Sequence, residues 1–179
     1  MKLKDVIQDA NTGLDAIKRA PIVNYNTGIR CLRIGDISQK NDFDKWGFTE
    51  VENSNYKRFE LKKNDIIIAR TGNTIGVNMF IYKNLNSVFN NGLIRLRVKN
   101  DCYAKYIYYN LQSTNFKNYI KSIAFGTSTQ PNMKINDLLD YEIPNFTYED
   151  QCRISKILSK FDEKIEINNL TNNNLLLVA

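Results

Sequence analysis

The longest regular pattern of apolar and polar positions runs from Tyr148 to Val178. This stretch contains no Pro or Gly, and its apolar residues recur at intervals of 4, 3 and 4. They are Ile154, Leu158, Phe161 and Ile165. That spacing predicts a helix with one narrow apolar seam. At the same spacing the seam continues through Asn168, Asn172 and Leu175.

A helix of this length would project roughly 45 Å, at 1.5 Å per residue. It cannot bury its own apolar seam, so it needs a partner helix. Two polar positions in the seam, Asn168 and Asn172, would then fix the register of pairing. The pattern predicts a coiled-coil-type rod that positions the rest of the chain.

Shorter patterns upstream predict a globular head. Apolar runs indicate strands at residues 29–34, 66–69, 77–82 and 92–98, and the continuous run at 66–69 is typical of a buried strand. Residues 103–123 indicate a helix with a break near Ser113 and Thr114. Residues 38–57 are polar with isolated aromatics, which indicates an excursion over the surface. The prediction is an α+β fold: one mixed α/β domain with a twisted sheet, followed by the long helix.

Three features of the head allow more specific interpretations. Asn64, in the turn before the buried strand, suits a left-handed backbone conformation. Arg95, Arg97 and Lys99 alternate with apolar residues, which predicts a strand with one basic face. Trp46 is either a hydrophobic plug that closes its loop onto the domain or a side chain that stacks on a nucleic acid.

Composition narrows the class of protein. A hydrophobic content of 42% with 10 Tyr and 9 Phe suffices for a core and excludes a disordered chain. No run approaches the ~20 apolar residues of a membrane span, and the first residues lack an apolar signal segment. The three cysteines, which are odd in number and far apart, are expected to be reduced packing residues of a cytoplasmic protein.

Several catalytic classes are excluded by what the sequence lacks. It has no His, so His-based triads and His-ligated metals are absent, and no two Cys have metal-ligand spacing. Ile143–Phe146 does not match the loop with which DNA methyltransferases hold a flipped base. Glu60-Leu61-Lys62 lacks the preceding Pro-Asp of a metal-dependent nuclease. The chain is expected to have no catalytic residue, metal or cofactor of its own.

The net charge of +6 is unevenly distributed. Residues 62–134 contain eleven basic residues against two acidic ones, whereas residues 135–179 contain four against eight. A concentrated basic block is typical of a polyanion-binding surface, although a solvated basic face has the same signature. Within the block, Arg70–Gly76 is a turn rich in hydrogen-bond donors. It lacks the Lys-Ser/Thr ending of a P-loop.

Five strings, in order along the chain, together resemble the specificity subunits of type I restriction–modification systems. They are Cys31–Ile37, Leu61–Gly72 with Ile75-Gly76, Tyr106–Phe116, Gly126–Gln130 and Ile143–Leu158. Together they cover most of the chain. Asn64 departs from the family's pattern by standing where Gly is usual, and Phe146 by standing where a second Pro is usual. The second departure bears on the geometry of the linker.

The resemblance implies a DNA target-recognition domain, residues 1–146, and a spacer and dimerisation helix, residues 147–179. Full-length members carry two of each, with their helices antiparallel. One of each implies a half-subunit or a fragment, and a half-subunit would dimerise with two-fold symmetry to read an interrupted palindrome. The implied partners are double-stranded DNA, methyltransferase subunits and, in some systems, a restriction subunit. S-adenosylmethionine, and ATP with Mg where a nuclease subunit exists, would bind those partners.

Candidate contact residues follow from this resemblance. Phosphate contacts are expected from Arg70, Lys121 and Lys134. Base contacts are expected from Lys40, Lys45, Trp46, Asn73 and Thr74. The DNA-binding set is completed by Thr71, Thr127, Ser128 and Gln130. The alternative function is a non-enzymatic coiled-coil scaffold whose basic face binds an acidic protein.

Overall fold

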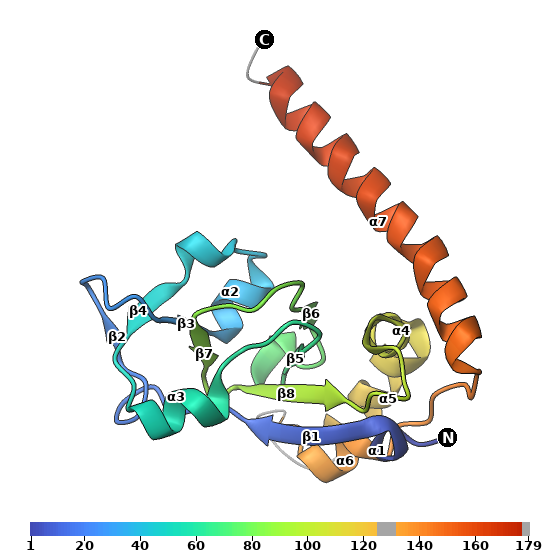
Figure 1. Cartoon of the computed structure of the whole chain (residues 1–179), viewed down its shortest axis with the longest axis horizontal. Helices are drawn as coiled ribbons and strands as arrows, with labels where there is room; N and C mark the ends of the chain where they lie inside the picture. The colour runs from blue at the N-terminus through green and yellow to red at the C-terminus, as the bar shows by residue number, and fades with distance from the viewer. Residues whose placement is uncertain (125–131, 177–179) are drawn as a thin grey trace.

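The structure, a computed structural model, describes residues 1–124 and 132–176. It consists of a head with two lobes and one long helix, α7 (Tyr148–Leu176), that projects away from the head (Figure 1). A mixed α/β head followed by a long C-terminal helix confirms the predicted fold class. Two sheets are present where the sequence indicated one.

The first lobe is built on an antiparallel sheet with strand order β1-β8-β5-β6. These strands are β1 (Ile7–Thr12), β8 (Leu93–Val98), β5 (Ile66–Ala69) and β6 (Asn78–Phe80). Four helices share a hydrophobic core with one face of the sheet. They are α1 (Leu3–Val6), α4 (Ala104–Asn110), α5 (Thr114–Ala124) and α6 (Ile135–Leu139).

The second lobe contains a smaller sheet with strand order β2-β4-β3-β7, in which β3 and β7 are parallel. Its strands are β2 (Ile22–Val23), β4 (Gly47–Thr49), β3 (Arg30–Leu32) and β7 (Ser87–Phe89). It also contains α2 (Ile34–Ser38), α3 (Asn53–Phe59) and the 3₁₀ turn η1 (Phe43–Lys45). A second turn, η2 (Gly72–Thr74), connects β5 to β6 in the first lobe.

Strand β5 explains how the two lobes form one head. Successive side chains of a strand point to opposite faces. Ile66 and Ile68 therefore belong to the core of the first lobe, whereas Ile67 and Ala69 belong to the core of the second. All four side chains are buried, so the continuous apolar run reflects a strand that is covered on both faces.

Several local predictions are confirmed. β5 has the predicted bounds, the helix of residues 103–123 breaks between α4 and α5, and Asn64 has a left-handed φ of 73°. The predicted surface excursion at residues 38–57 is confirmed, since all of its residues except Trp46 and Thr49 are exposed or half-buried, although η1, β4 and the start of α3 give it regular structure. Trp46 and Phe59 anchor this polar segment in the second core, with exposures of 3% and 5%.

Helix α7 has a packed beginning and an exposed remainder. Thr147 caps it by accepting the Asp150 backbone N–H at 3.2 Å. Gln151 and Ser155 are buried against the head, whereas every described side chain from Lys160 to Asn172 is exposed. Among the described helices, none is long and apolar enough to cross a membrane.

Candidate nucleic-acid interface

Arg70 is held at the end of β5 by two segments that are distant in sequence. Its backbone N–H donates to Gly92 O at 2.9 Å, and its carbonyl accepts the Met133 N–H at 2.8 Å. Its guanidinium Nη2 donates to Asn132 Oδ1 at 2.9 Å, and Thr71 forms a β-bridge with Asn132. The ion pairs between described residues do not include Arg70. These contacts therefore orient a cation whose charge is not cancelled by a carboxylate.

The turn after Arg70 lies against α5. Gly76 has a φ of 85°, and a Cβ at this position would lie 3.1 Å from Ile120 Cγ2, so only Gly fits without strain. This close approach places Asn73, which is exposed, and Thr74 beside the helix that carries Lys121. Asn132 and Met133, the two residues that hold Arg70, are called the strap below. Lys134 directly follows the strap and is also exposed. The structure thus gathers Arg70, Asn73, Thr74, Lys121 and Lys134 on one edge of the head.

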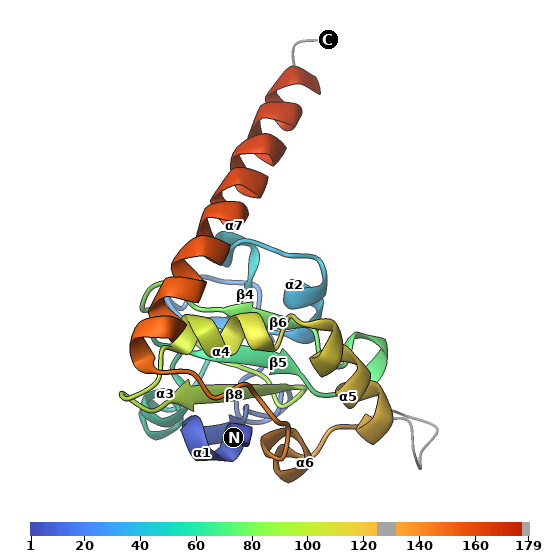
Figure 2. The same ribbon diagram turned by 90° about the vertical axis from the view of Figure 1, so that its right-hand side faces the viewer.

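The same edge continues into the second lobe. Gly92, which accepts from Arg70, is packed so closely against Ile34 of α2 that a Cβ would lie 2.4 Å from Ile34 Cδ1. In Figure 2, α2 and α5 both lie toward the side of the head away from the base of α7. A cavity of about 420 Å³ beside α2 is lined by side chains that include Arg33, Lys45 and Asn90.

The structure favours the plug interpretation of Trp46. Its indole Nε1 donates to Asn41 O at 3.0 Å, and its ring packs edge-on against Phe43 with centroids 5.3 Å apart. A ring that is only 3% exposed cannot stack on a base in this conformation. Trp46 instead fixes the turn that carries Lys45, which is exposed on the rim of the cavity.

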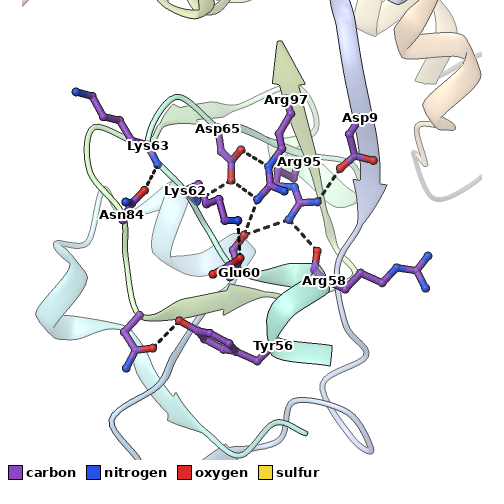
Figure 3. A network of polar contacts seen from close by, with 11 residues as sticks. Asp9, Tyr56, Arg58, Glu60, Lys62, Lys63, Asp65, Asn84, Arg95 and Arg97 are labelled. Carbon is purple, nitrogen blue, oxygen red and sulfur yellow. Dashed lines mark hydrogen bonds and ion pairs between the residues drawn. The ribbon is translucent and has the colours of Figure 1, made fainter. Parts of the chain in front are cut away.

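The predicted basic face of β8 is turned into the protein. Arg95 is 1% exposed; it donates to the carbonyls of Arg58 and Glu60 and pairs with Asp9 at 2.8 Å (Figure 3). Arg97 pairs with the buried Asp65 at 2.8 Å. The strand has the predicted basic face, but the end of α3 and the carboxylates of Asp9 and Asp65 cover it. These two arginines connect the sheet to the end of α3 and are not available to an external anion.

Other members of the basic block are also engaged within the chain. Lys62 pairs with Glu60 at 2.6 Å, and Lys99 Nζ donates to Asp5 O at 2.7 Å. Lys105 Nζ lies 5.2 Å from the centroid of the Tyr82 ring. Lys99, Lys105 and Tyr82 line a cavity of about 400 Å³ at the base of α7. Two of its three lysines are engaged within the chain, and the third, Lys63, is exposed.

A cavity of about 810 Å³ lies in the second lobe. Its lining mixes bases with acids: Lys18, Arg19, Glu50 and Glu52. This cavity therefore does not favour a polyanion. Within the described part of the chain, no three Cys, Asp or Glu side chains are grouped so that they could hold a metal ion.

A hydrogen-bonded joint sets the direction in which α7 leaves the head. Gln151 Oε1 accepts the Tyr103 N–H at 2.9 Å, and its Nε2 donates to Phe146 O at 2.9 Å. Further along, the Tyr109 hydroxyl donates to Asp162 at 2.6 Å. Burial, and then this hydrogen bond, raise the pKa of the Tyr109 phenol. The phenol therefore remains a hydrogen-bond donor at neutral pH.

Beyond this joint the predicted seam is exposed. Ile154 packs partly against the head, but Leu158, Phe161 and Ile165 have exposures of 36%, 63% and 58%. Asn168 and Asn172 are also exposed, and the side chain of Leu175 lies outside the described residues. Ile157, Ile167 and Leu170 expose further apolar surface outside the seam. The rod therefore presents more than one apolar face.

Comparison with known proteins identifies the family. A family model described as the type I restriction modification DNA specificity domain matches residues 1–177. The chain belongs to this family. The resemblance that the sequence strings indicated is thereby confirmed.

Relatives of this specificity family match most of the chain. A provisionally assigned type I restriction enzyme specificity subunit, MjaX of Methanocaldococcus jannaschii, is 29% identical over 170 residues, which cover 92% of this chain and 39% of the relative. The MjaIX specificity subunit of the same organism is 35% identical over 77 residues, 43% of this chain and 18% of the relative. The chain spans about two fifths of MjaX, the relative that matches it over most of its length.

Solved structures give the same result for the fold. The S subunit of a type I restriction–modification system from M. genitalium superposes with a TM-score of 0.63 and 25% identity, covering 93% of this chain and 39% of that one. The HsdS subunit from Thermoanaerobacter tengcongensis superposes with a TM-score of 0.66 and 17% identity, covering 93% and 37%.

The specificity-domain structure separates the predicted contact residues into three groups. Arg70, Thr71, Asn73, Thr74, Lys121 and Lys134 lie together around the strap and α5. Lys40 and Lys45 lie beside α2, where Lys40 is exposed with a φ of 54°. Thr127, Ser128 and Gln130 lie outside the described residues. Sequence reasoning missed Asn132, Arg33 and Asn90, although Arg33 lies inside a string that matched the family.

Proposed function

We propose that this chain is a non-catalytic DNA-reading subunit of a type I restriction–modification system. Residues 1–146 form the target-recognition domain and read one half of a bipartite site. Residues 147–179 form the spacer that sets the distance to a second reader. The observation that carries this proposal is the division of a specificity-family chain into one packed head and one exposed rod.

The edge around Arg70 supports the DNA-binding part of the proposal. It presents a strapped arginine and two exposed lysines, Lys121 and Lys134, without a pairing carboxylate among the described residues. Cations without carboxylate partners suit phosphate oxygens, which position a protein on a duplex. Asn73 and Thr74, in the turn that follows Arg70, can hydrogen-bond to base edges, which specify the sequence.

The exposed seam of α7 supports dimerisation. Phe161 and Ile165 are more than half exposed on α7, beyond its packed beginning. Pairing with a second copy buries this apolar surface, with Asn168 and Asn172 selecting the register. Because the chain spans only about 39% of MjaX and of the M. genitalium subunit, a pair of chains restores two heads and two rods. Such a dimer presents identical readers to an interrupted palindrome.

The remaining partners follow from the same proposal. Methyltransferase subunits dock on the rod and bind S-adenosylmethionine. A restriction subunit, where the system has one, supplies ATP- and Mg-dependent cleavage. In this arrangement the chain contributes recognition and spacing, and the chemistry resides in its partners.

Two measurements test this function. Light scattering of the purified chain should give the mass of a dimer, and Phe161→Asp should shift it toward the monomer because a carboxylate replaces the most exposed aromatic of the seam. Lys156→Asp, on an exposed residue outside the seam, is the matched control. Selection from a random duplex library, with methyltransferase subunits present, should enrich an interrupted palindrome. Enrichment of no sequence would contradict the proposal.

A further inference from the structure

The cavity beside α2 contains cationic groups that the edge around Arg70 does not use. Arg33 and Lys45 line it from different segments, and Asn90 lines it from the loop after β7. Its volume of about 420 Å³ is large enough for one phosphodiester group and its water. Among the described residues, Lys45 forms no ion pair. Lys45 therefore remains available to an external anion, whereas Arg33 lies 3.9 Å from one carboxylate, that of Asp36.

One carboxylate, Asp36, also lines this cavity, and hydrogen bonds within the chain engage both of its oxygens. Asp36 is 4% exposed, and its oxygens accept the Arg33 backbone N–H at 2.9 Å and Asn41 Nδ2 at 3.1 Å. Arg33 Nε is 3.9 Å from this carboxylate, too far for a hydrogen bond. The guanidinium side chain, 44% exposed, keeps donors for an external oxygen.

The wall formed by Asn90 is rigid. The Asn90 N–H donates to Leu32 O at 3.0 Å, and the Asn91 N–H donates to Leu14 O at 2.8 Å. A Cβ on Gly13 would lie 2.4 Å from Asn90 O, so the backbone is tightly packed. Asn90 Oδ1 is buried and has no hydrogen-bond partner among the described residues. The buried Oδ1 only accepts and cannot bind a phosphate, so the group that can donate to a phosphate oxygen beside the two cations is the Nδ2 of the same amide, for which no hydrogen bond is found among the described residues.

The position of the cavity connects it to the proposed interface. Two residues after Asn90, Gly92 accepts from the Arg70 N–H and packs against Ile34 of α2. The segment from Asn90 to Gly92 therefore connects the cavity to Arg70. Helix α2, which lines the cavity, and helix α5, which packs on the turn after Arg70, both lie on the side of the head away from the base of α7 (Figure 2).

We propose that Arg33, Lys45 and the Asn90 amide form a second phosphate clamp, which binds one phosphodiester of the DNA backbone. This inference rests on the proposed DNA-binding function and extends it to the second lobe. Lys45, which the sequence indicated as a base contact, acts as a positioning contact instead. Two clamps on different lobes fix the rotation of the head on the duplex, because one contact leaves it free to pivot.

The test is the salt dependence of binding to the selected duplex, measured on the complex with methyltransferase subunits. Arg33→Gln and Lys45→Gln should each lower the slope of log affinity against log salt by about 1. For the double variant, the loss of affinity relative to the parent chain should shrink about tenfold between 50 and 200 mM salt. Arg33→Lys should restore most of the slope, since it keeps the charge.

Lys57→Gln is the matched control, because Lys57 is an exposed lysine on α3, on the other side of the head in Figure 2. The base preference selected from a random library should stay unchanged in every variant, since a phosphate carries no sequence information. A changed preference, or an unchanged slope in a parent complex that binds normally, would overturn the clamp alone. Failure of the parent complex to bind any duplex would remove the proposed function and the clamp together. Inorganic phosphate at millimolar concentration should compete only weakly, and strong competition would identify a free-anion site instead.

Discussion

Arg95 and Arg70 belong to the same basic stretch of sequence but have opposite surroundings. Arg95 is 1% exposed on an inner strand, where it pairs with Asp9 and donates to two carbonyls. Arg70 follows the last residue of β5, where, among the described residues, an amide oxygen, that of Asn132, accepts from its guanidinium. Position in the sheet, and not charge density in the sequence, decides which arginine serves folding and which is available for binding.

Arg95→Met should have the largest effect on stability. It keeps most of the aliphatic length but removes the bonds to the carbonyls of Arg58 and Glu60, and it leaves Asp9 without its cation. We expect the free energy of unfolding to fall by roughly 3 kcal/mol, toward the lower end for broken buried pairs because Asp9 is partly exposed. Urea unfolding measures this loss. Lys121→Met, on the surface, should change it by less than about 0.5 kcal/mol. Similar values for both variants would contradict the structural role of Arg95.

Arg70→Gln should weaken DNA binding without lowering the stability of the head. DNA affinity should fall about tenfold, a loss of about 1.4 kcal/mol in binding, and the salt slope should decrease by about 1. The free energy of unfolding should change little, because the backbone hydrogen bonds of the strap remain. Fluorescence anisotropy over a salt series measures the binding change. If the variant bound DNA with the affinity of the parent chain, Arg70 would not be part of the DNA interface.

The sequence predicted those features of the fold that depend on local pattern. The continuous run Ile66–Ala69 indicated a strand buried on both faces, and Asn64 indicated its left-handed turn. The 4-3-4 spacing indicated α7. Each of these follows from periodicity or backbone preference within a few residues.

The parts that the sequence did not predict depend on contacts between distant segments. The alternation of Arg95 and Arg97 with apolar residues is the same for an exposed basic face and for one covered by α3. The contacts of Arg95 with the carbonyls of Arg58 and Glu60, at the end of α3, distinguish the two. Asn132 was missed because its role requires Arg70, 62 residues away. Trp46 kept two interpretations until its hydrogen bond to Asn41 decided between them.

Asn132→Asp should also weaken DNA binding at unchanged stability, by less than Arg70→Gln. The carboxylate can keep the contact to Arg70 Nη2 and would partly neutralise its charge. DNA affinity should therefore fall about threefold to tenfold while stability is unchanged within about 1 kcal/mol, the range of exposed ion pairs. Asn132→Ala removes the strap without adding charge and serves as the comparison. If Asp and Ala at this position weakened binding equally, orientation alone, and not the uncancelled charge, would explain the role of Asn132.

Lysine footprinting of the complex with its selected duplex tests the central claim most directly. The reactivity of each exposed lysine toward acetylation is measured with and without DNA. The account predicts protection of Lys45, Lys121 and Lys134, on the edge that Arg70 connects, and unchanged reactivity of Lys18 and Lys57 elsewhere on the second lobe. Protection of Lys18 and Lys57 with full reactivity on the Arg70 edge would contradict it.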